Sequence, residues 1–375
     1  MTLPVIVEEF LELVRLPVGV RRERPIADAL IAKLKALGLS VEEDGTGAVI
    51  GGDTGNLIAR LEGDPAKPSL LFSAHLDRVE NHGRIQPRVS EDGRNIRSDG
   101  SSILAADDVS GICAILDGLR RVQAEGLAHG PIEVVLSVAE EVGLLGARHL
   151  DYSKIRSKMA YIVDVSGPVG TLVNQAPTQY TLKITVRGRS AHAGMEPEKG
   201  LNAIRVAAVA LARLPEGRLS PRTTSNFGIF KAGRATNIVC DLAEIEGEAR
   251  SSDPGELTEY LALVEEVFQE TARTFGAEVT VETHLEYDTY RVAEDEEVIQ
   301  LAGRAMKNLG LNMEIVASGG GSDGNFFNRN GLTAVGLSPG YLKVHTSEEE
   351  QPVDELIKCG ELVAEIIREA ARSAA

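Results

Sequence analysis

Acidic and imidazole side chains follow four short apolar runs in this sequence, and another acid precedes a helical pattern at Asp107. Two imidazoles and at least three carboxylates, with no cysteine nearby, form a ligand set that suits Zn²⁺, Mn²⁺ or Co²⁺. The pattern therefore points to metal-assisted chemistry. The residues are His75 and Asp77 after 69–74, Glu140 and Glu141 after 132–139, Asp164 after 160–163, and His345 after 332–337.

Each of these residues alone has an ordinary structural explanation. A single His after a strand is usually a surface or core residue, and Asp107 could simply cap a helix. Adjacent acids such as Glu140 and Glu141 are usually solvated. Asp164 is harder to dismiss, because burying an unpaired carboxylate costs several kcal/mol. Together they favour a functional site, since strand carboxyl ends meet at one edge of an open α/β sheet.

The spacing of the acids suits a hydrolytic reaction. Side chains of adjacent residues in an extended segment point to opposite sides, so one of Glu140 and Glu141 can bind metal while the other faces substrate. Bound metal lowers the pKa of water toward ~7, and a nearby carboxylate can take up the released proton. Two adjacent metals need a bridging group and separate terminal ligands, and the set is large enough for both. Asp77 is expected to accept the second ring N–H of His75.

The elements that carry these residues alternate between helix and strand. Apolar spacing predicts helices, while short runs rich in Val, Ile and Leu predict buried strands. We therefore predict an α/β fold with a mixed, mostly parallel sheet and helices on both faces. The predicted helices are 5–16, 25–37, 108–123, 296–309 and 353–371, and the predicted strands are 56–61, 69–74, 132–139, 160–165, 314–317 and 332–337.

The pattern changes character near residue 179. We predict an inserted α+β domain at 179–289, with one sheet and two helices on one face, and a discontinuous catalytic domain formed by 1–178 and 290–375. The cleanly alternating strand 180–186 is expected to offer a sheet edge for pairing with a second copy. The other predicted strands of the insert are 226–230, 235–250 and 278–287, and its predicted helices are 200–214 and 256–275.

Composition excludes several classes of partner. The 375 residues carry a net charge of −17, which argues against a nucleic-acid surface or an anionic membrane face. Trp is absent and aromatic residues make up 4%, so a platform of stacked rings for sugars or bases is not expected. Three separated cysteines without a CxxC pair, no signal-peptide pattern and no long apolar stretch indicate a cytoplasmic protein.

A series of motifs resembles the M20 metallopeptidases, the dizinc aminoacylase and carboxypeptidase group, and is most similar to its peptidase T branch. The resemblance runs in order over nearly the whole chain and implies a zinc-exopeptidase-like catalytic domain. It also implies that the insert is a lid, through which a homodimer could form. The motifs are Ser73-Ala-His75-Leu-Asp77, Leu104-Ala-Ala-Asp107-Asp108-Val-Ser-Gly111, Ala139-Glu140-Glu141-Val-Gly143, Val163-Asp164, Gly188-Arg-Ser-Ala-His192-Ala-Gly194, Ala235-Thr-Asn237-Ile, Gly319-Gly-Gly-Ser-Asp-Gly-Asn325 and Val344-His345-Thr346.

The resemblance implies two divalent metal ions per chain, with zinc expected and manganese or cobalt as alternatives. Asp107 would bridge the ions, and its peptide bond to Asp108 is expected to be cis. The remaining roles that the family implies are His75 and Asp164 on one metal, Glu141 and His345 on the other, Glu140 as general base, and Asp77 orienting His75.

The resemblance also assigns residues of the insert to substrate. His192 is expected to reach a substrate carbonyl oxygen, in many relatives from the partner subunit. Asn237 and Arg250 match a substrate-contacting pair, with Arg250 holding a carboxylate, although a surface salt bridge explains Arg250 equally well. Three consecutive glycines would line the substrate cleft, or they could form a plain loop. They are not a phosphate-binding loop, because no GK[ST] sequence follows them. They are Gly319, Gly320 and Gly321.

These expectations lead to one functional hypothesis with alternatives. The first is hydrolysis of a peptide bond in short peptides, releasing the N-terminal residue of tripeptides, with a metal-activated water and Glu140 as general base. A related amidohydrolase, either a carboxypeptidase or an N-acyl-amino-acid deacylase, is the alternative, and a non-catalytic binding protein is a third reading. Arg78 stands where relatives usually have Thr, so we expect a more cationic cleft beside the metals.

Overall fold

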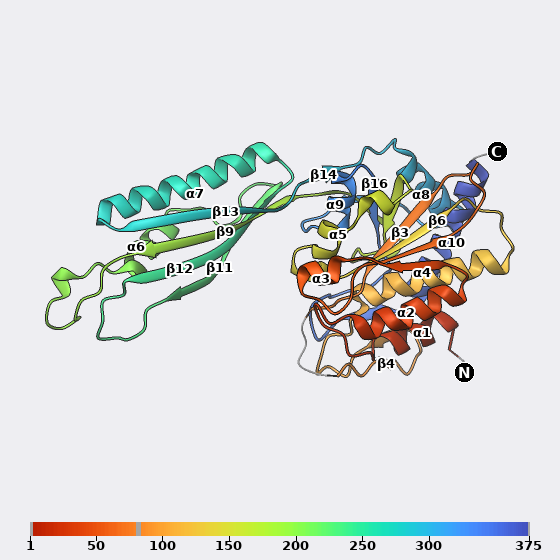
Figure 1. Cartoon of the computed structure of the whole chain (residues 1–375), viewed down its shortest axis with the longest axis horizontal. Coiled ribbons are helices and arrows are strands. Elements are labelled where there is room, and N and C mark those ends of the chain that lie inside the picture. The colour runs from red at the N-terminus through yellow and green to blue at the C-terminus, as the bar shows by residue number, and fades with distance from the viewer. Residues whose placement is uncertain (1–2, 80–83, 374–375) are drawn as a thin grey trace. The chain divides into compact units, whose positions relative to one another are not determined.

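The computed structural model describes residues 3–79 and 84–373, which fold as two compact units (Figure 1). Unit 1 comprises Met1–Gln175, Arg291–Ser318 and Ser322–Ala375. Unit 2 comprises Ala176–Tyr290 together with Gly319–Gly321. In the described part of the chain, no helix is both long and apolar enough to cross a membrane.

A nine-stranded sheet forms the centre of unit 1, in the order β1-β2-β6-β3-β7-β16-β8-β14, with β15 beside β8. Neighbours among β6, β3, β7 and β16 are parallel, whereas β1–β2, β2–β6 and β16–β8 are antiparallel. The predicted mixed, mostly parallel sheet is confirmed. The strands are β1 (Ser40–Glu43), β2 (Leu57–Leu61), β3 (Leu70–His75), β6 (Ile132–Ser137), β7 (Met159–Ile162), β8 (Thr171–Ala176), β14 (Tyr290–Arg291), β15 (Glu314–Ala317) and β16 (Thr333–Leu337).

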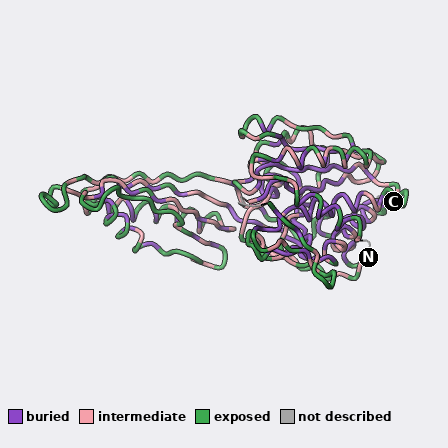
Figure 2. Tube along the Cα trace, turned by 90° about the horizontal axis from the view of Figure 1, so that it is seen from below, coloured by how far each residue is buried: buried purple, intermediate pink, exposed green. Residues whose placement is uncertain are grey.

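Helices cover this sheet. Every residue of β3 and β6 is buried, as expected for strands that are covered on both faces. Buried segments run through the interior of unit 1 (Figure 2). Helices α1, α4, α10 and α8 contact one another in that order, while α3, α5 and α9 form a second group. The helices are α1 (Val5–Leu13), α2 (Arg24–Ala36), α3 (Thr46–Ile50), α4 (Ala106–Ala124), α5 (Leu145–His149), α8 (Glu297–Asn308), α9 (Asp323–Arg329) and α10 (Val353–Ser373), with 3₁₀ turns η1 (Glu140–Val142) and η2 (Tyr152–Lys154).

The long helix α4 shows why the sequence pattern was informative. Ile112, Ile115, Leu116 and Leu119 recur at helical spacing and are all buried. Several short elements had no clear apolar pattern and were not predicted, among them β1, β8, α9 and a three-stranded sheet. That small sheet contains β17 (Glu350–Pro352), β5 (Asn95–Arg97) and β4 (Arg88–Val89).

Unit 2 is a five-stranded sheet in the order β10-β11-β12-β9-β13, with two helices against its apolar face. Leu182, Ile184 and Val186 of β9 are buried, whereas the residues between them are more exposed, as the alternation predicted. The elements are β9 (Thr178–Arg187), β10 (Gly217–Arg218), β11 (Thr223–Ala232), β12 (Leu242–Ser251), β13 (Glu278–Tyr287), α6 (Ala203–Leu211), α7 (Pro254–Phe275) and the 3₁₀ turn η3 (Pro197–Lys199).

Two expectations for the insert are wrong. β9 lies between β12 and β13, so the segment 180–186 is interior to the sheet and offers no free edge. The strand expected at 235–250 begins only at Leu242, because 235–241 follow an irregular path held by single contacts such as Ala193 N–H to Asn237 O. Alternating apolar residues indicate a strand, but they do not indicate its neighbours.

Candidate metal centre

The four parallel strands of unit 1 bring the acidic and imidazole residues to one edge of the sheet. β3 ends at His75, and its neighbours β6 and β7 lead into Glu140 and Asp164. β16 leads into the loop that carries His345. These residues, far apart in the sequence, therefore belong to one site because adjacent parallel strands share their carboxyl edge.

Asp107 lies between the two histidines. Its Oδ1 is 2.8 Å from Nε2 of His75, and its Oδ2 is 3.3 Å from Nε2 of His345. The peptide bond between Asp107 and Asp108 is cis, as the family resemblance implied. One carboxylate thus faces each imidazole with a different oxygen, which is the arrangement that a bridging ligand requires.

The other predicted ligands flank this pair. Glu141 Oε1 is 3.0 Å from His345 Nε2, and Asp164 Oδ1 is 3.8 Å from His75 Nε2. Within the described residues, the ligand atoms of His75, Asp107 and Glu141 lie within 4.8 Å of one another, and so do those of His75, Asp108 and Asp164. The second set includes Asp108, to which the sequence analysis gave no role.

Glu140 and Glu141 do not lie in an extended segment, as was assumed, but in the turn η1. The Asp77 carboxylate accepts the main-chain N–H of Glu140 at 2.9 Å and that of Glu141 at 3.2 Å. Nδ1 of His75 is 3.1 Å from the main-chain oxygen of Asp77 and 3.4 Å from its Oδ1. Asp77 therefore contacts His75 and also fixes the main chain that carries both glutamates.

Unusual backbone conformations occur beside these residues. Ala105, Ala139 and His345 have φ of 60°, 51° and 61°, in the left-handed region that non-glycine residues rarely adopt. Such conformations concentrate at functional sites. Gly111 is required by a close approach, because a Cβ there would lie 2.0 Å from the main-chain oxygen of Val163. α4 can thereby approach the strand end that carries Asp164.

The electrostatics of the site reflect many acids in a small volume. Burial, reinforced by Asp107, raises the pKa of Asp164 to about 7. Burial also raises the pKa of Glu140 well above its ordinary value, with Asp164 adding to the effect. Hydrogen bonds to Asp107 and Glu141 raise the pKa of His345 to about 10. The protein thus gathers more negative charge here than the two imidazoles neutralise, so the donor set fits divalent cations.

Sequence reasoning missed three residues that hold this site. Asp108 is buried and accepts the main-chain N–H of His75 at 3.1 Å. The Tyr341 hydroxyl donates to Asp164 Oδ1 at 2.7 Å. Glu349 accepts main-chain N–H groups of the segment that ends at Asp107. No residue pattern marks Glu349 in the sequence, because its contacts depend on the conformation of the loop.

Arg78 lies three residues after the end of β3. Its side chain is buried, with 3% of the residue exposed, and Nη1 donates to the main-chain oxygen of Val14 at 3.2 Å. Arg78 therefore lies in the interior of unit 1, and the more cationic cleft expected beside the metals stays a prediction. Burial lowers the pKa of Arg78 to about 10, while the charges of Glu349 and Asp77 act in the opposite direction.

In unit 2, His192 and Asn237 belong to neighbouring segments. The ring Nδ1 of His192 accepts the main-chain N–H groups of Gly194 at 3.1 Å and Met195 at 3.2 Å. In the neutral ring the proton therefore lies on Nε2, so the exposed imidazole presents an N–H donor. The main-chain oxygen of Asn237 accepts the N–H of Ala193 at 3.0 Å, and its side chain is exposed.

Arg250 lies near the glycine segment of the same unit. Its guanidinium forms two hydrogen bonds with Glu248, both 2.9 Å long. A Cβ at Gly320 would lie 3.5 Å from Nη1 of Arg250. The N–H of Gly321 donates to the Tyr287 hydroxyl at 3.0 Å. Arg250 thus forms a salt bridge, as one of the two explanations of this residue predicted. It also lies next to Gly320.

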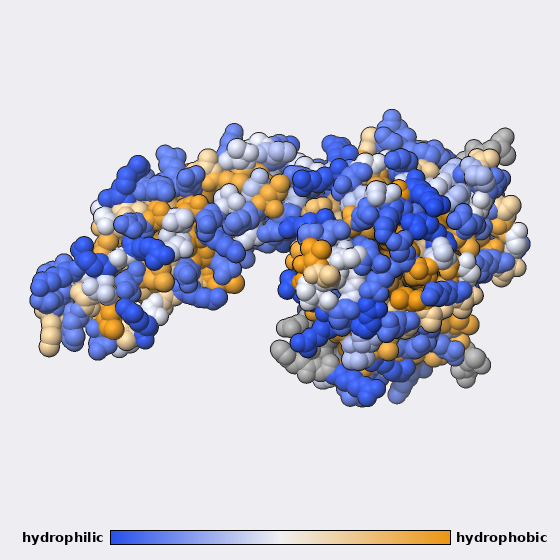
Figure 3. Space-filling model, in the orientation of Figure 1, coloured by the Kyte–Doolittle hydropathy of each residue, from blue (hydrophilic) through white to orange (hydrophobic). Residues whose placement is uncertain are grey.

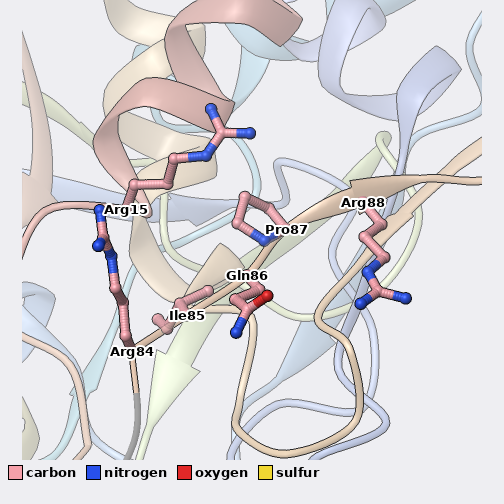
Figure 4. A pocket seen from close by; sticks show the side chains of 6 residues that line it. All are labelled: Arg15, Arg84, Ile85, Gln86, Pro87 and Arg88. Carbon is pink, nitrogen blue, oxygen red and sulfur yellow. The ribbon is translucent and has the colours of Figure 1, made fainter.

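A separate cavity of about 450 Å³ in unit 1 is lined by none of the predicted metal ligands (Figure 4). Its arginines are Arg15, Arg84 and Arg88, whose guanidinium groups do not converge in this view. Hydrophilic residues with small hydrophobic patches among them cover the visible face of unit 1 (Figure 3), in keeping with the net charge of −17. Among the described residues, the candidate clusters of metal ligands contain none of the residues that line this cavity.

Comparisons with known proteins agree with this architecture. The family model described as a peptidase dimerisation domain of the M20 group matches residues 179–275, and the model for peptidase family M28 matches residues 56–181. A crystal structure of aminopeptidase PepT from Bacillus cereus is 39% identical, with 98% of each chain covered and a TM-score of 0.89. A tripeptidase structure from Staphylococcus aureus is 36% identical, with 98% of each chain covered and a TM-score of 0.94.

A more distant structure shares the fold. It is described as a dinuclear metal-binding peptidase of the M20 family from Bacillus subtilis, with 15% identity, a TM-score of 0.74, and coverage of 98% of this chain and 97% of the other. The match to the aminopeptidase and the tripeptidase covers 98% of this chain, so it includes both the strand edge and the insert. The chain belongs to the M20 peptidase family, in its peptidase T-like branch.

Proposed function

We propose that this peptidase is a metal-dependent aminopeptidase that acts on short peptides and releases the N-terminal residue of tripeptides. The observation that carries the proposal is the Asp107 carboxylate, which faces His75 with one oxygen and His345 with the other. The names aminopeptidase and tripeptidase, given to two relatives more than 30% identical, support the choice of substrate.

The proposed cofactor is a pair of divalent metal ions, with zinc first and manganese or cobalt as alternatives. Asp107 would be shared, and the name of the dinuclear M20 relative supports the number. When bound, such ions polarise a peptide carbonyl and lower the pKa of water. The proposed holders besides Asp107 are His75 and Asp164 for one ion, and Glu141 and His345 for the other.

Glu140 is the proposed general base. It would take a proton from the attacking water and return it to the leaving amine. Its carboxylate is buried beside the metal-ligating groups, and Asp77 holds its main chain. A base must be held within hydrogen-bond reach of the reacting water, and this support gives Glu140 a defined position.

Residues of unit 2 are proposed to recognise substrate, with 179–289 acting as the lid. His192 presents an Nε2–H donor suited to a carbonyl oxygen that gains negative charge during the reaction. Arg250 has a guanidinium that can pair with a substrate carboxylate in place of Glu248. Asn237 and the glycine segment would complete the contacts, the latter being Gly319, Gly320 and Gly321.

We also propose a homodimer formed through the lid and a cytoplasmic location. The dimerisation-domain match supports the first. β11 is paired with β10 only at Thr224 and Ser225, and Ile229 and Phe230 further along it are each 43% exposed, so this strand offers an edge to a second copy. The three cysteines are buried free thiols, as in proteins of a reducing compartment.

A substrate panel tests the activity. Di- and tripeptides and N-acetylated tripeptides are incubated with the protein in Zn²⁺, Mn²⁺ or Co²⁺, and the products are identified by mass spectrometry. We expect tripeptides with a free amine to lose their N-terminal residue, and acetylated peptides to persist. Cleavage of the acetylated peptides in preference to the free ones would favour the deacylase alternative. Cleavage of neither with any metal would contradict the proposal.

A further inference from the structure

We propose that Glu349 is a positioning residue that sets the arrangement of Asp107 and His345 for metal binding. The inference rests on the proposed metal centre but concerns a residue that ligates nothing itself. The observation behind it is that the buried carboxylate of Glu349, in the loop of His345, accepts main-chain N–H groups from the segment of Asp107.

Glu349 holds the segment that precedes and includes Asp107. Its Oε2 accepts the main-chain N–H of Leu104 at 2.7 Å and that of Ala105 at 2.8 Å. Its Oε1 accepts the N–H of Asp107 itself at 3.0 Å. Only 1% of Glu349 is exposed, so these buried donors depend on it rather than on solvent. Hydrogen bonds to a charged acceptor are stronger than neutral ones, which makes this an effective support for a non-helical segment.

The same residue belongs to the loop that carries His345. Leu342 and Glu350 close this loop through two main-chain hydrogen bonds of 2.9 and 3.0 Å. Within it, the N–H of Glu349 donates to the main-chain oxygen of Thr346 at 3.2 Å. The Glu349 side chain therefore ties the loop of His345 directly to the segment of Asp107. These two ligands are far apart in the sequence, because Asp107 lies at the start of α4 and His345 lies in the loop after β16.

Glu349 and Asp77 play corresponding parts on the two sides of the site. Asp77 accepts two main-chain N–H groups from the turn of Glu140 and Glu141, and Glu349 accepts three from the segment of Asp107. Burial lowers the pKa of Arg78, whereas the negative charges of Glu349 and Asp77 both act to raise it.

Glu349→Gln removes the charge while keeping the size of the side chain. One carbonyl oxygen cannot replace both carboxylate oxygens, because the amide nitrogen would face a main-chain donor. We expect the affinity for Zn²⁺ to fall by about 10- to 100-fold, the usual effect of losing a group that orients metal ligands. Excess Zn²⁺ should restore peptidase activity. Glu348→Gln is the matched control, because Glu348 is exposed and adjacent to Glu349. The Zn²⁺ affinity of this control variant should equal that of the wild type.

The experiment measures Zn²⁺ affinity by competition with a chromophoric chelator on metal-free full-length protein, and thermal unfolding of the same samples. Weaker binding by Glu349→Gln, with metal-free unfolding near that of the wild type, supports positioning. Equal affinity in Glu349→Gln and Glu348→Gln overturns it. If Glu349→Gln does not fold, Glu349→Asp is the second variant, since it keeps the charge on a shorter side chain. Wild-type Zn²⁺ affinity in Glu349→Asp would overturn the proposal. Failure of both variants to fold would also overturn it, in favour of a purely structural role. Because the assay reads binding rather than cleavage, its result does not depend on the substrate.

Discussion

The carboxylate of Asp77 accepts the main-chain N–H of Glu140 at 2.9 Å. The same carboxylate accepts the N–H of Glu141 at 3.2 Å, while the Asp77 main-chain oxygen lies 3.1 Å from the His75 ring. One aspartate thus links the end of β3 to the turn after β6. The support for the proposed base and the support for a proposed ligand are therefore the same residue.

Asp77→Asn should lower kcat more than it lowers metal content. An amide can accept only one of the two N–H groups well, so the turn of Glu140 would lose its fixed position. We expect a fall in kcat of about 10- to 100-fold. Steady-state kinetics and elemental analysis of the same preparations would check this. Wild-type kcat in the variant would show that Glu140 does not need the support of Asp77.

Glu140→Ala should retain metal and lose most activity. General-base catalysis contributes about 10²- to 10⁴-fold, and Glu140 is not among the proposed ligands. Glu141→Ala is the control that should lose metal, because Glu141 faces His345 at 3.0 Å. Metal content and tripeptide turnover of both variants separate the two adjacent acids. Near wild-type turnover in Glu140→Ala would mean that the base has been assigned to the wrong residue.

Much of unit 1 could be predicted because its strands are short, apolar and locally encoded. The runs before His75, Glu140 and Asp164 predict β3, β6 and β7 within two residues at their starts. Parallel strands share a carboxyl edge, so convergence of their following residues also follows from general rules. The alternation of buried and exposed residues in β9 was predictable for the same local reason.

The remainder depends on contacts between segments that are distant in the chain. The three N–H groups bound by Glu349 lie about 240 residues before it, and acceptance of a main-chain N–H leaves no residue pattern. The interior place of β9 is likewise set by pairing with β12 and β13. Burial of Arg78 depends on the end of α1 covering it through the Val14 carbonyl.

His192→Ala should reduce kcat without removing metal. Two main-chain donors occupy Nδ1 and leave the proton on Nε2, so the variant loses one donor for the oxygen that becomes charged. Loss of such a donor typically costs about 10²- to 10³-fold in kcat. His284→Ala, at an exposed position of β13, is the matched control and should behave as the wild type. If both variants had unchanged kinetics, His192 would have no part in the reaction.

Gly321→Ala should impair substrate binding, whereas Gly319→Ala should be tolerated. A Cβ at Gly321 would lie 2.3 Å from the Tyr287 ring, whose hydroxyl is held by Gln179 at 2.5 Å. Among the residues that the structure describes, no neighbouring atom lies within 4 Å of a Cβ built at Gly319. Forcing the ring aside costs about 1–3 kcal/mol and would displace the glycine segment. Comparison of KM for a tripeptide in the two variants is the test, and equal KM values would exclude this segment from substrate binding.

Glu23→Gln should stabilise the protein at neutral pH but not at acidic pH. The buried Glu23 carboxyl accepts the N–H groups of Arg21 at 2.8 Å and Ala139 at 3.2 Å with Oε1, while Oε2 has no hydrogen-bond partner in the described part of the chain. Burial raises the pKa of Glu23 from 4.5 to about 7. The charged form is therefore less favourable in the folded state than in the unfolded one.

The sign of the pH effect follows from this difference. Below pH 4.5 both states hold the Glu23 proton, and between pH 4.5 and about 7 only the folded state holds it, so wild-type stability falls as pH rises through this window. Above it the loss is constant and at most about 3 kcal/mol, at 1.36 kcal/mol per pKa unit. Glu23→Gln keeps the accepting oxygen and cannot titrate. Its free energy of unfolding in urea, relative to the wild type, should rise between pH 5 and 7 and then level off. Glu8→Gln, at an exposed position of α1, is the control and should show no such rise. If the free energy of unfolding of Glu23→Gln relative to the wild type stayed constant between pH 5 and 7, the pKa of Glu23 would not be raised by burial.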